Sequence, residues 1–320
     1  MALPSGLATN FPAEPAPAEA GAAVDPDTLI MLENSAGAGP FVLLCDHASN
    51  RVPDEYKSFG FAAGQLGLHI AWDPGALGVA RLLSGRLDAP LFWPDISRLV
   101  IDCNRPLDAA SLIVVESEGR AVPANVGLSG TERARRIECV HAPYHDAIDA
   151  CLTQRHASGL ATILIAIHSF TPVYLGKARP WHVGIVFDED ARMANALIKG
   201  LAADPGFMVG VNEPYSPADL VYYSVSRHAR THRLPAAMIE IRNNEIGDEA
   251  GQKRWADRLA EILLAATPRP ARGSTSCGVI IASGIGYSRA LWGVGKWLKQ
   301  NTKAGFRIIF RARTTSSSAS

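Results

Sequence analysis

Short apolar runs that switch abruptly to polar residues recur along this chain, and longer stretches with helical periodicity separate them. Four of these runs end in polar motifs, at residues 41–50, 98–106, 163–172 and 236–243. A run of Val, Ile, Leu and Ala that stops at a polar residue is typical of a buried strand, so the pattern predicts four such strands. Their polar ends are the first places to look for function, because ligands collect at the carboxyl ends of strands in an open parallel sheet.

Helical periodicity appears between and after these runs. The predicted helices span residues 75–87, 131–155, 189–203 and 249–266. In the last of them Trp255, Leu259 and Leu263 recur every four residues and give one apolar face. Strands that alternate with helices in this way predict an α/β fold, with a mostly parallel or mixed sheet and helices on both faces.

Composition divides the chain into three segments. Residues 1–28 are rich in Ala, Pro and Gly without periodicity, which predicts a loose extension; residues 29–267 form the expected domain. Residues 268–320 are a basic, Gly- and Ser-rich tail in which Arg289 and Lys296 argue against a membrane-spanning helix. We expect this tail to be a poorly ordered extension without function, and a basic amphipathic surface helix over 289–303 is the alternative for part of it.

Length, charge and cysteine content narrow the class of protein. A chain of 320 residues that is 48% hydrophobic can bury one large core. All 31 acidic residues lie at or before Glu261, so the body is acidic and gives no reason to expect a nucleic-acid partner. The five cysteines are odd in number and lack C-x-x-C pairs, which argues against a disulfide framework or zinc ribbon. Without a recognisable secretory signal either, we expect a cytoplasmic protein with no membrane partner.

Two histidines, His47 and His168, each stand at the end of an apolar run. Either one alone would be read as a histidine that caps a turn or completes the edge of the core. Two such placements in one chain favour a metal site, because neutral imidazole is a common metal ligand. Asp46 could hydrogen-bond to His47 on the side away from the metal and so orient its ring.

A zinc hydrolase typically needs a third protein ligand, and Asp73 is the candidate. It directly precedes a predicted helix, where an N-capping role is equally expected for Asp. Asn50 and Asp46 are weaker alternatives for the third ligand.

Glu240 lies inside the apolar run of residues 236–243. Burying a carboxylate is costly unless it has a partner, and a general base beside a metal site would have one. The alternative is an ion pair with Arg242 or another arginine; the pair with Arg242 is possible because residues i and i+2 of a strand share a face.

Asn104 and Arg105 follow the run that begins at Arg98. A guanidinium beside an amide is suited to bidentate capture of a substrate carboxylate. Arg98 could instead polarise a carbonyl under attack. Ordinary surface ion pairs remain the alternative for both arginines.

Other histidines form weaker patterns. His141 and His145 have helical i, i+4 spacing, but Pro143 between them suggests a helix start and no Glu follows His141, so a structural role is favoured over metal binding. His228 and His232 share that spacing, and exposed polar residues explain them at least as well as a role beside the substrate. Cys45 lies near His47, but a buried cysteine at a strand end is favoured over a nucleophile. No Gly-x-Ser-x-Gly motif supports a serine hydrolase.

Together, five motifs resemble the N-formylglutamate amidohydrolase family, in family order across residues 29–266. They are Asp46-His-Ala-Ser-x-x-x-Pro53, Trp72-Asp-x-Gly-Ala76, Asp102-Cys-Asn-Arg105, His168-Ser-Phe-Thr-Pro172 and Glu240-Ile-Arg-Asn243. The chain is more distantly similar to the zinc carboxypeptidases, which implies a zinc-exopeptidase-like fold. Their His-x-x-Glu zinc motif is absent, because Ala-Ser-Asn50 follows His47. That departure is why Asp73 is considered as the third ligand.

The resemblance implies hydrolysis of N-formyl-L-glutamate to formate and L-glutamate, a late step of histidine breakdown, with one divalent metal, expected to be zinc. It implies that Glu240 takes the proton of the attacking water and passes it to the leaving amine. It also implies that Arg98 helps to hold the oxyanion and that Asn104 and Arg105 bind a substrate carboxylate. A deacylase of another N-acyl amino acid and a noncatalytic binder of an acidic ligand on the same fold are the alternatives.

Overall fold

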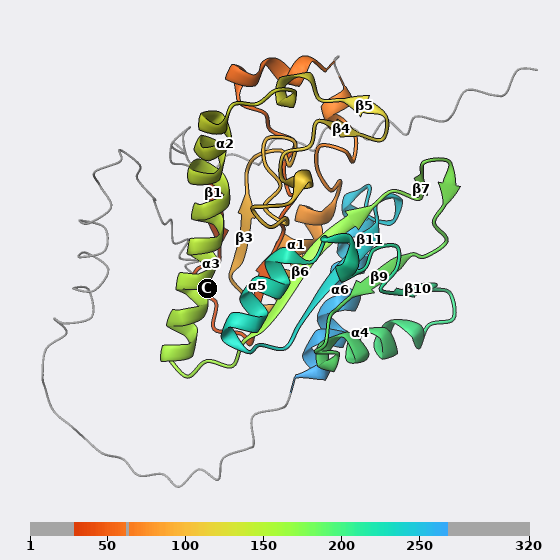
Figure 1. The fold of residues 1–320 in the computed structure, drawn as a ribbon. Coiled ribbons are helices and arrows are strands. Elements are labelled where there is room, and N and C mark those ends of the chain that lie inside the picture. The colour runs from red at the N-terminus through yellow and green to blue at the C-terminus, as the bar shows by residue number, and fades with distance from the viewer. Residues whose placement is uncertain (1–28, 62–63, 268–320) are drawn as a thin grey trace, which may run out of the picture. The chain divides into compact units, whose positions relative to one another are not determined.

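The structure is a computed structural model and describes residues 29–61 and 64–267. Three predictions fall outside the described residues: the extension of residues 1–28, the tail of residues 268–320 and the amphipathic helix considered within that tail. The main sheet has seven strands in the order β1-β3-β2-β6-β11-β9-β10 (Figure 1). These strands are β1 (Ile30–Glu33), β2 (Phe41–Leu44), β3 (Leu91–Pro94), β6 (Ile163–Phe170), β9 (Val183–Val186), β10 (Val209–Val211) and β11 (Ala236–Arg242).

The sheet is mixed, as the sequence predicts. Strands β3, β2, β6 and β11 run parallel to one another, β9 is antiparallel to β11, and β1 is antiparallel to β3. Two small hairpins stand apart from it, β4 (Glu116–Ser117) with β5 (Arg120–Ala121), and β7 (Val173–Tyr174) with β8 (Lys177–Ala178).

Helices cover both faces of the sheet. They are α1 (Ala76–Leu87), α2 (Gly130–Arg136), the π-helical turn η5 (Ile137–His141), α3 (Ala142–Ala157), α4 (Arg192–Ala202), α5 (Tyr223–His232) and α6 (Glu249–Ala266). Helices α1, α4 and α6 pack against one face, and α3 and α5 against the other (Figure 1). Successive side chains of a strand point to opposite faces, so Ile165 of β6 joins the first core and Leu164 the second.

The predicted helices are found with small shifts at their ends, and α6 has the predicted bounds. Pro143 lies in the first turn of α3, as predicted for a proline at a helix start, although α2 and η5 precede it so that one helical run extends from Gly130 to Ala157. Proline lacks the N–H that would continue the α-helical ladder, and the π turn immediately before it accommodates that loss.

The prediction of a strand within residues 98–106 is wrong. Residues 98–105 form no strand, and β3 precedes them at Leu91–Pro94. Leu99, Val100 and Ile101 are nevertheless buried. They are apolar because they pack in the core, and not because they form a strand. Side chains satisfy the carbonyls instead: Asn125 donates to Leu99 and Arg136 to Val100, at 2.8 and 2.9 Å.

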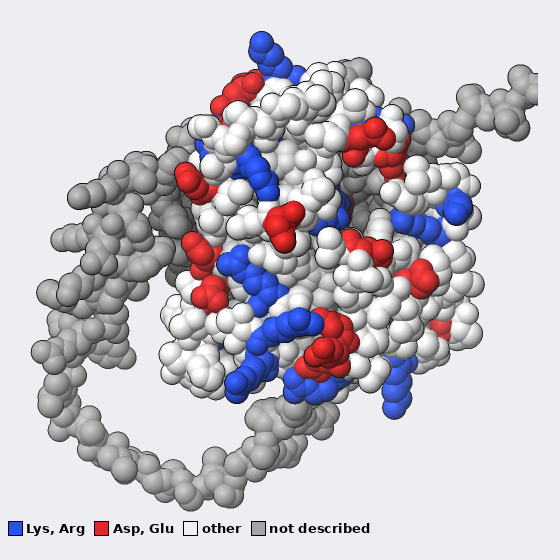
Figure 2. Space-filling model, in the orientation of Figure 1, with Lys and Arg blue, Asp and Glu red and all other residues white. Residues whose placement is uncertain are grey.

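On the surface, Lys and Arg side chains are interspersed with Asp and Glu on the face shown in Figure 2. Several described pairs are in contact, among them Arg135 with Glu55 at 2.9 Å and Lys253 with Asp257 at 2.7 Å. In the part of the chain that the structure describes, no helix is both long enough and apolar enough to cross a membrane.

Candidate metal and catalytic site

The predicted site residues meet at the carboxyl ends of the central parallel strands of the sheet. His47 follows β2, His168 lies near the end of β6, and Glu240 lies in β11, and these three strands are neighbours in the sheet. His168 and Glu240 are paired across β6 and β11, so their side chains share a face of the sheet. The convergence expected from strand ends is therefore present.

Asp73 reaches the same point from the turn before α1. Helix α1 has Gly75 at its N-cap position and no capping side chain, so the N-capping alternative for Asp73 is wrong. Gly75 has a φ of 79°, and a Cβ there would lie 2.2 Å from the carbonyl oxygen of Ile246. Only glycine fits this turn, which directs the Asp73 side chain away from the helix and toward the two histidines.

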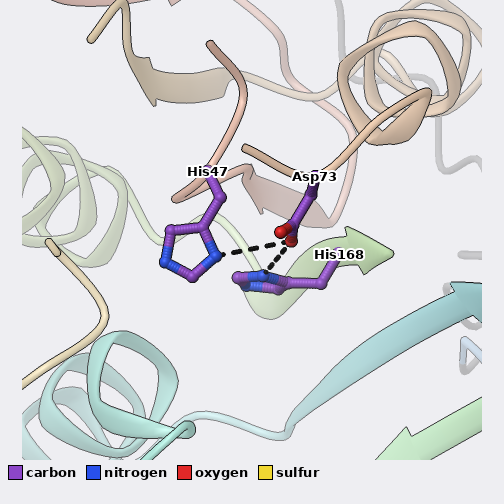
Figure 3. Close-up of side chains that lie close together, drawn as sticks. All are labelled: His47, Asp73 and His168. Atoms are coloured by element: carbon purple, nitrogen blue, oxygen red, sulfur yellow. Dashed lines mark hydrogen bonds and ion pairs between the residues drawn. The ribbon is translucent and has the colours of Figure 1, made fainter. Parts of the chain in front are cut away.

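The side chains of His47, Asp73 and His168 form a compact cluster, in which one ligand atom from each lies within 4.8 Å of the others. Asp73 Oδ2 is 2.9 Å from His168 Nδ1 and 3.4 Å from His47 Nδ1 (Figure 3). All three residues are buried. Two imidazoles and one carboxylate, with space for a water, form the donor set of a catalytic zinc site.

Two further carboxylates each hold the far side of one histidine ring. His47 Nε2 donates to Asp102 Oδ1 at 2.7 Å, and His168 Nε2 donates to Asp46 Oδ2 at 3.0 Å. The expectation that Asp46 orients His47 is thus wrong, because Asp46 orients His168 and Asp102 orients His47. With Nε2 protonated and held by a carboxylate, each Nδ1 can serve as a metal ligand. The donor set therefore fits a divalent cation such as zinc.

The cluster shifts the pKa values of its members. Burial opposes ionisation of Asp46, but the hydrogen bond and charge of His168 outweigh it and lower the pKa of this carboxyl to about 2. Burial also disfavours the imidazolium form of His168, yet Asp46 and Asp73 raise its pKa well above the ordinary value. The protein surrounds these rings with enough negative charge to stabilise a cation between them.

Glu240 lies beside the cluster with an uncommitted oxygen. Its Oε2 is buried and has no hydrogen-bond partner among the described residues. Burial, supported by the Asp73 carboxylate, raises the Glu240 pKa to about 7 despite the opposing charge of His168. The alternative ion pair with Arg242 is wrong, because Arg242 binds Glu245 at 2.9 Å. A buried carboxylate of this pKa next to a metal site is suited to accept and return a proton near neutral pH.

Arg98, Asn104 and Arg105 line the same cavity. Arg98 donates to Asp102 at 2.6 Å and lies 3.7 Å from Asp73, which ties it to both carboxylates that contact His47. Arg105 donates to Ser111 Oγ at 3.1 Å and to the Asn104 carbonyl at 2.8 Å. Both guanidiniums thus face the cavity from fixed positions.

The side-chain amide of Asn104 forms hydrogen bonds within the protein. Its amide nitrogen donates to the carbonyl of Val221, and its Oδ1 accepts from the backbone N–H of Ser224 at 3.0 Å. These contacts attach the loop of residues 98–105 to the beginning of α5. In this arrangement Asn104 positions its neighbour Arg105 and does not present a free amide to the cavity.

The cavity above the cluster has a volume of about 300 Å³. Beyond the residues already described, its walls include His69, Glu116, Ser117, Glu118, Tyr174 and Tyr215. His69 binds Glu118 at 2.7 Å, and Tyr215 accepts a hydrogen bond from Arg179 at 3.1 Å. A cavity of this size accommodates a small molecule.

Sequence comparison identifies the family. The family model for N-formylglutamate amidohydrolases matches residues 39–247, which contain every residue of this site. The chain belongs to the N-formylglutamate amidohydrolase family.

Two solved structures are similar in fold. The chain is similar to a gene product of Agrobacterium tumefaciens, with 41% identity and a TM-score of 0.73 over 74% of this chain and 94% of the other. It also shares its fold with an N-formylglutamate amidohydrolase from Ralstonia eutropha, at 19% identity and a TM-score of 0.55 over 74% and 97% of the two chains. No curated protein matches the chain.

At least two features of this site were not predicted from the sequence. One is the role of Asp102 as the partner of His47, although the Asp102-Cys-Asn-Arg105 motif contains it. An aspartate at the end of an apolar run is itself a signal for such a role. The other is Tyr215, which lies in the cavity wall and follows no recognisable pattern.

Proposed function

We propose that this member of the family hydrolyses the formyl amide of N-formyl-L-glutamate to formate and L-glutamate with one bound zinc ion. The observation that carries the proposal is the His47, Asp73 and His168 cluster with the uncommitted carboxylate of Glu240 beside it. When bound, zinc supplies a Lewis acid that polarises a carbonyl and lowers the pKa of water. His47, Asp73 and His168 would hold it.

Glu240 acts as the general base and then as the general acid. Its carboxylate takes a proton from the water that attacks the formyl carbon, so a C–O bond forms. It then gives that proton to the amide nitrogen as the C–N bond breaks, which releases formic acid and the free amine. The acid proton then passes to the amine, so the products are formate and the ammonium form of L-glutamate. Burial of Glu240 supports this role, because it brings the carboxyl pKa to about 7.

The two arginines divide the negative charges of the substrate. Arg98 lies next to Asp73 and faces the oxyanion that develops on the formyl oxygen. Arg105 binds a carboxylate of the amino acid, and Asn104 keeps that guanidinium in place through its contacts with Val221 and Ser224. An acidic N-acyl amino acid fits a cavity with this arrangement.

We also place the enzyme in the cytoplasm. Among the described residues, Cys103, Cys139 and Cys151 are thiols outside any disulfide, as expected in a reducing compartment.

The test is formate release by the purified full-length protein. We expect turnover of N-formyl-L-glutamate that disappears on chelation and returns with zinc. N-formyl-L-glutamine, which keeps the formyl amide and lacks the side-chain charge, is the matched substrate and should react more slowly. Zinc binding without formate release would refute this substrate and leave a deacylase of another N-acyl amino acid or a noncatalytic binder. Turnover that resists chelation would refute the metal mechanism.

A further inference from the structure

Three buried histidines outside the metal cluster lie behind the loop of residues 98–105. They are His141, His145 and His228, each exposed by 1% or less. His145 Nδ1 is 3.0 Å from His228 Nε2, and the rings of His141 and His145 are 4.5 Å apart. Two of them have nitrogens directed at backbone carbonyls, so their chemistry differs from that of a metal site.

One helical run supplies three hydrogen bonds to this loop. Arg136 donates to the carbonyl of Val100 at 2.9 Å, His145 to Cys103 at 2.9 Å and His141 to Arg105 at 3.0 Å. The π turn of residues 137–141 directly follows the first donor and ends at the second, His141, and it brings these two residues, five apart, to the same side. We call Arg136, His141 and His145 the loop clamp.

The loop needs such partners because it forms no strand. Its apolar residues are buried, so its carbonyls cannot turn to water. A lost partner would leave the Val100 or Arg105 carbonyl unsatisfied, and would leave the Cys103 carbonyl with only the Ser224 hydroxyl, which lies 3.2 Å away and also donates to Asp46. The loop also carries Asp102, which holds His47, and Arg105, which faces the cavity. The position of the loop therefore determines the position of groups at both ends of the site.

The hydrogen-bond directions fix the tautomers. A carbonyl only accepts, so the proton of His145 must be on Nε2. His145 Nδ1 is then an acceptor, and His228 Nε2 must carry the proton that it receives. Burial lowers the pKa of His145 well below the ordinary value and that of His228 to about 4, which keeps both rings neutral. A protonated His145 would place two donors against each other at 3.0 Å.

We propose that His145, in the tautomer fixed by His228, is a positioning residue for substrate binding: it holds the loop so that Arg105 keeps its place in the cavity. The kinetic part of this inference rests on the proposed function, whereas the tautomer and the loop contact do not. None of the three metal-cluster residues lies on the loop, so zinc stoichiometry is expected to be independent of His145.

The first experiment compares His145→Leu with His145→Gln in the zinc-loaded, full-length protein. Leucine removes the donor to Cys103, and glutamine can still donate from its amide nitrogen. We expect His145→Leu to raise KM for N-formyl-L-glutamate by about tenfold with little change in kcat, the scale of one lost hydrogen bond, and His145→Gln to restore most of it. An unchanged KM in the leucine variant, or a loss of kcat and zinc that glutamine does not rescue, would overturn the proposal.

His232→Leu is the matched control. His232 lies on α5 with His228, one helical turn further, but it binds the exposed Asp149 at 2.7 Å and contacts no part of the loop in the described structure. We expect its KM to equal that of the wild type. A rise as large as that of His145→Leu would mean that a disturbed contact between α3 and α5, and not the clamp, causes the effect.

The second experiment needs neither turnover nor a stable variant. In the ¹⁵N-histidine NMR spectrum of the wild-type protein, His145 should stay neutral with its proton on Nε2 from about pH 5.5 to 8. A proton on Nδ1, or titration near the ordinary histidine pKa, would overturn the proposal. If formate release fails while this tautomer is found, the proposed substrate is wrong and the clamp stands.

Discussion

Two clusters of buried histidines lie on opposite sides of the loop of residues 98–105, and their partners separate them. In the metal cluster, His47 and His168 each turn Nε2 to a carboxylate and Nδ1 toward Asp73. In the clamp, His145 turns Nε2 to a carbonyl and Nδ1 to His228. Carboxylates stabilise positive charge, whereas a carbonyl and a second imidazole in a buried site favour neutral rings. The same residue type thus forms a donor set suited to a cation in one place and, in our proposal, a fixed scaffold for the loop in the other.

The largest effect is expected from removing a ligand. His168→Ala deletes one of three donors and should abolish zinc binding and lower kcat/KM by about 10³-fold or more, because the Lewis acid is lost. Metal analysis and formate release measure both. His145→Gln should keep its zinc. Equal loss of zinc from the two variants would remove the distinction between the clusters.

Glu240→Gln should spare the metal and stop the chemistry. Glutamine has nearly the same shape but cannot take a proton, so kcat should fall by about 10²- to 10⁴-fold while zinc remains bound. The measurement is single-turnover formate release with metal content determined on the same sample. A variant that keeps more than a tenth of the wild-type kcat would show that another group is the base.

The orienting carboxylates should have intermediate effects. Asp46→Asn and Asp102→Asn leave the ligands in place but weaken the hold on His168 and His47, and zinc affinity should fall by about 10- to 100-fold. Competition with a chromophoric chelator measures this. Asp149→Asn is the control, since Asp149 binds His232 in the same way far from the metal cluster. Unchanged affinity in both test variants would contradict the assigned roles.

The smallest effect is a pH dependence. Burial raises the Glu240 pKa to about 7, and the base must be ionised to act, so kcat/KM should fall about tenfold per pH unit as the pH drops below this pKa. A bound cation favours the ionised form of Glu240, so it moves this acidic limb of the pH profile to lower pH. A pH profile on N-formyl-L-glutamate measures it, and the residual activity of Glu240→Gln should lack the limb. Activity that rises on acidification would contradict the role of Glu240.

The sequence predicted the metal cluster better than the clamp, for a physical reason. His47 and His168 stand where apolar runs end, and parallel strands bring such ends to one edge regardless of strand order. Glu240 stood out because a carboxylate in an apolar run needs an explanation. These local signals sufficed to select all three residues and the α/β class.

Contacts between distant segments could not be predicted in this way. The pairing of Asp102 with His47 and of His228 with His145 depends on how the loop of residues 98–105 packs against α3 and α5. Leu99, Val100 and Ile101 resemble a strand in sequence, because burial in a loop and burial in a sheet select the same apolar side chains. The antiparallel strand β9 beside β11 likewise has no local signal.

The most direct test of the comparison is anomalous diffraction at the zinc edge from crystals of the zinc-loaded protein. We expect a single strong peak within the described part of the chain, between His47 Nδ1, His168 Nδ1 and the Asp73 carboxylate. We expect no anomalous density beside His141, His145 or His228. A peak at the clamp histidines, or none at the metal cluster under saturating zinc, would contradict this expectation.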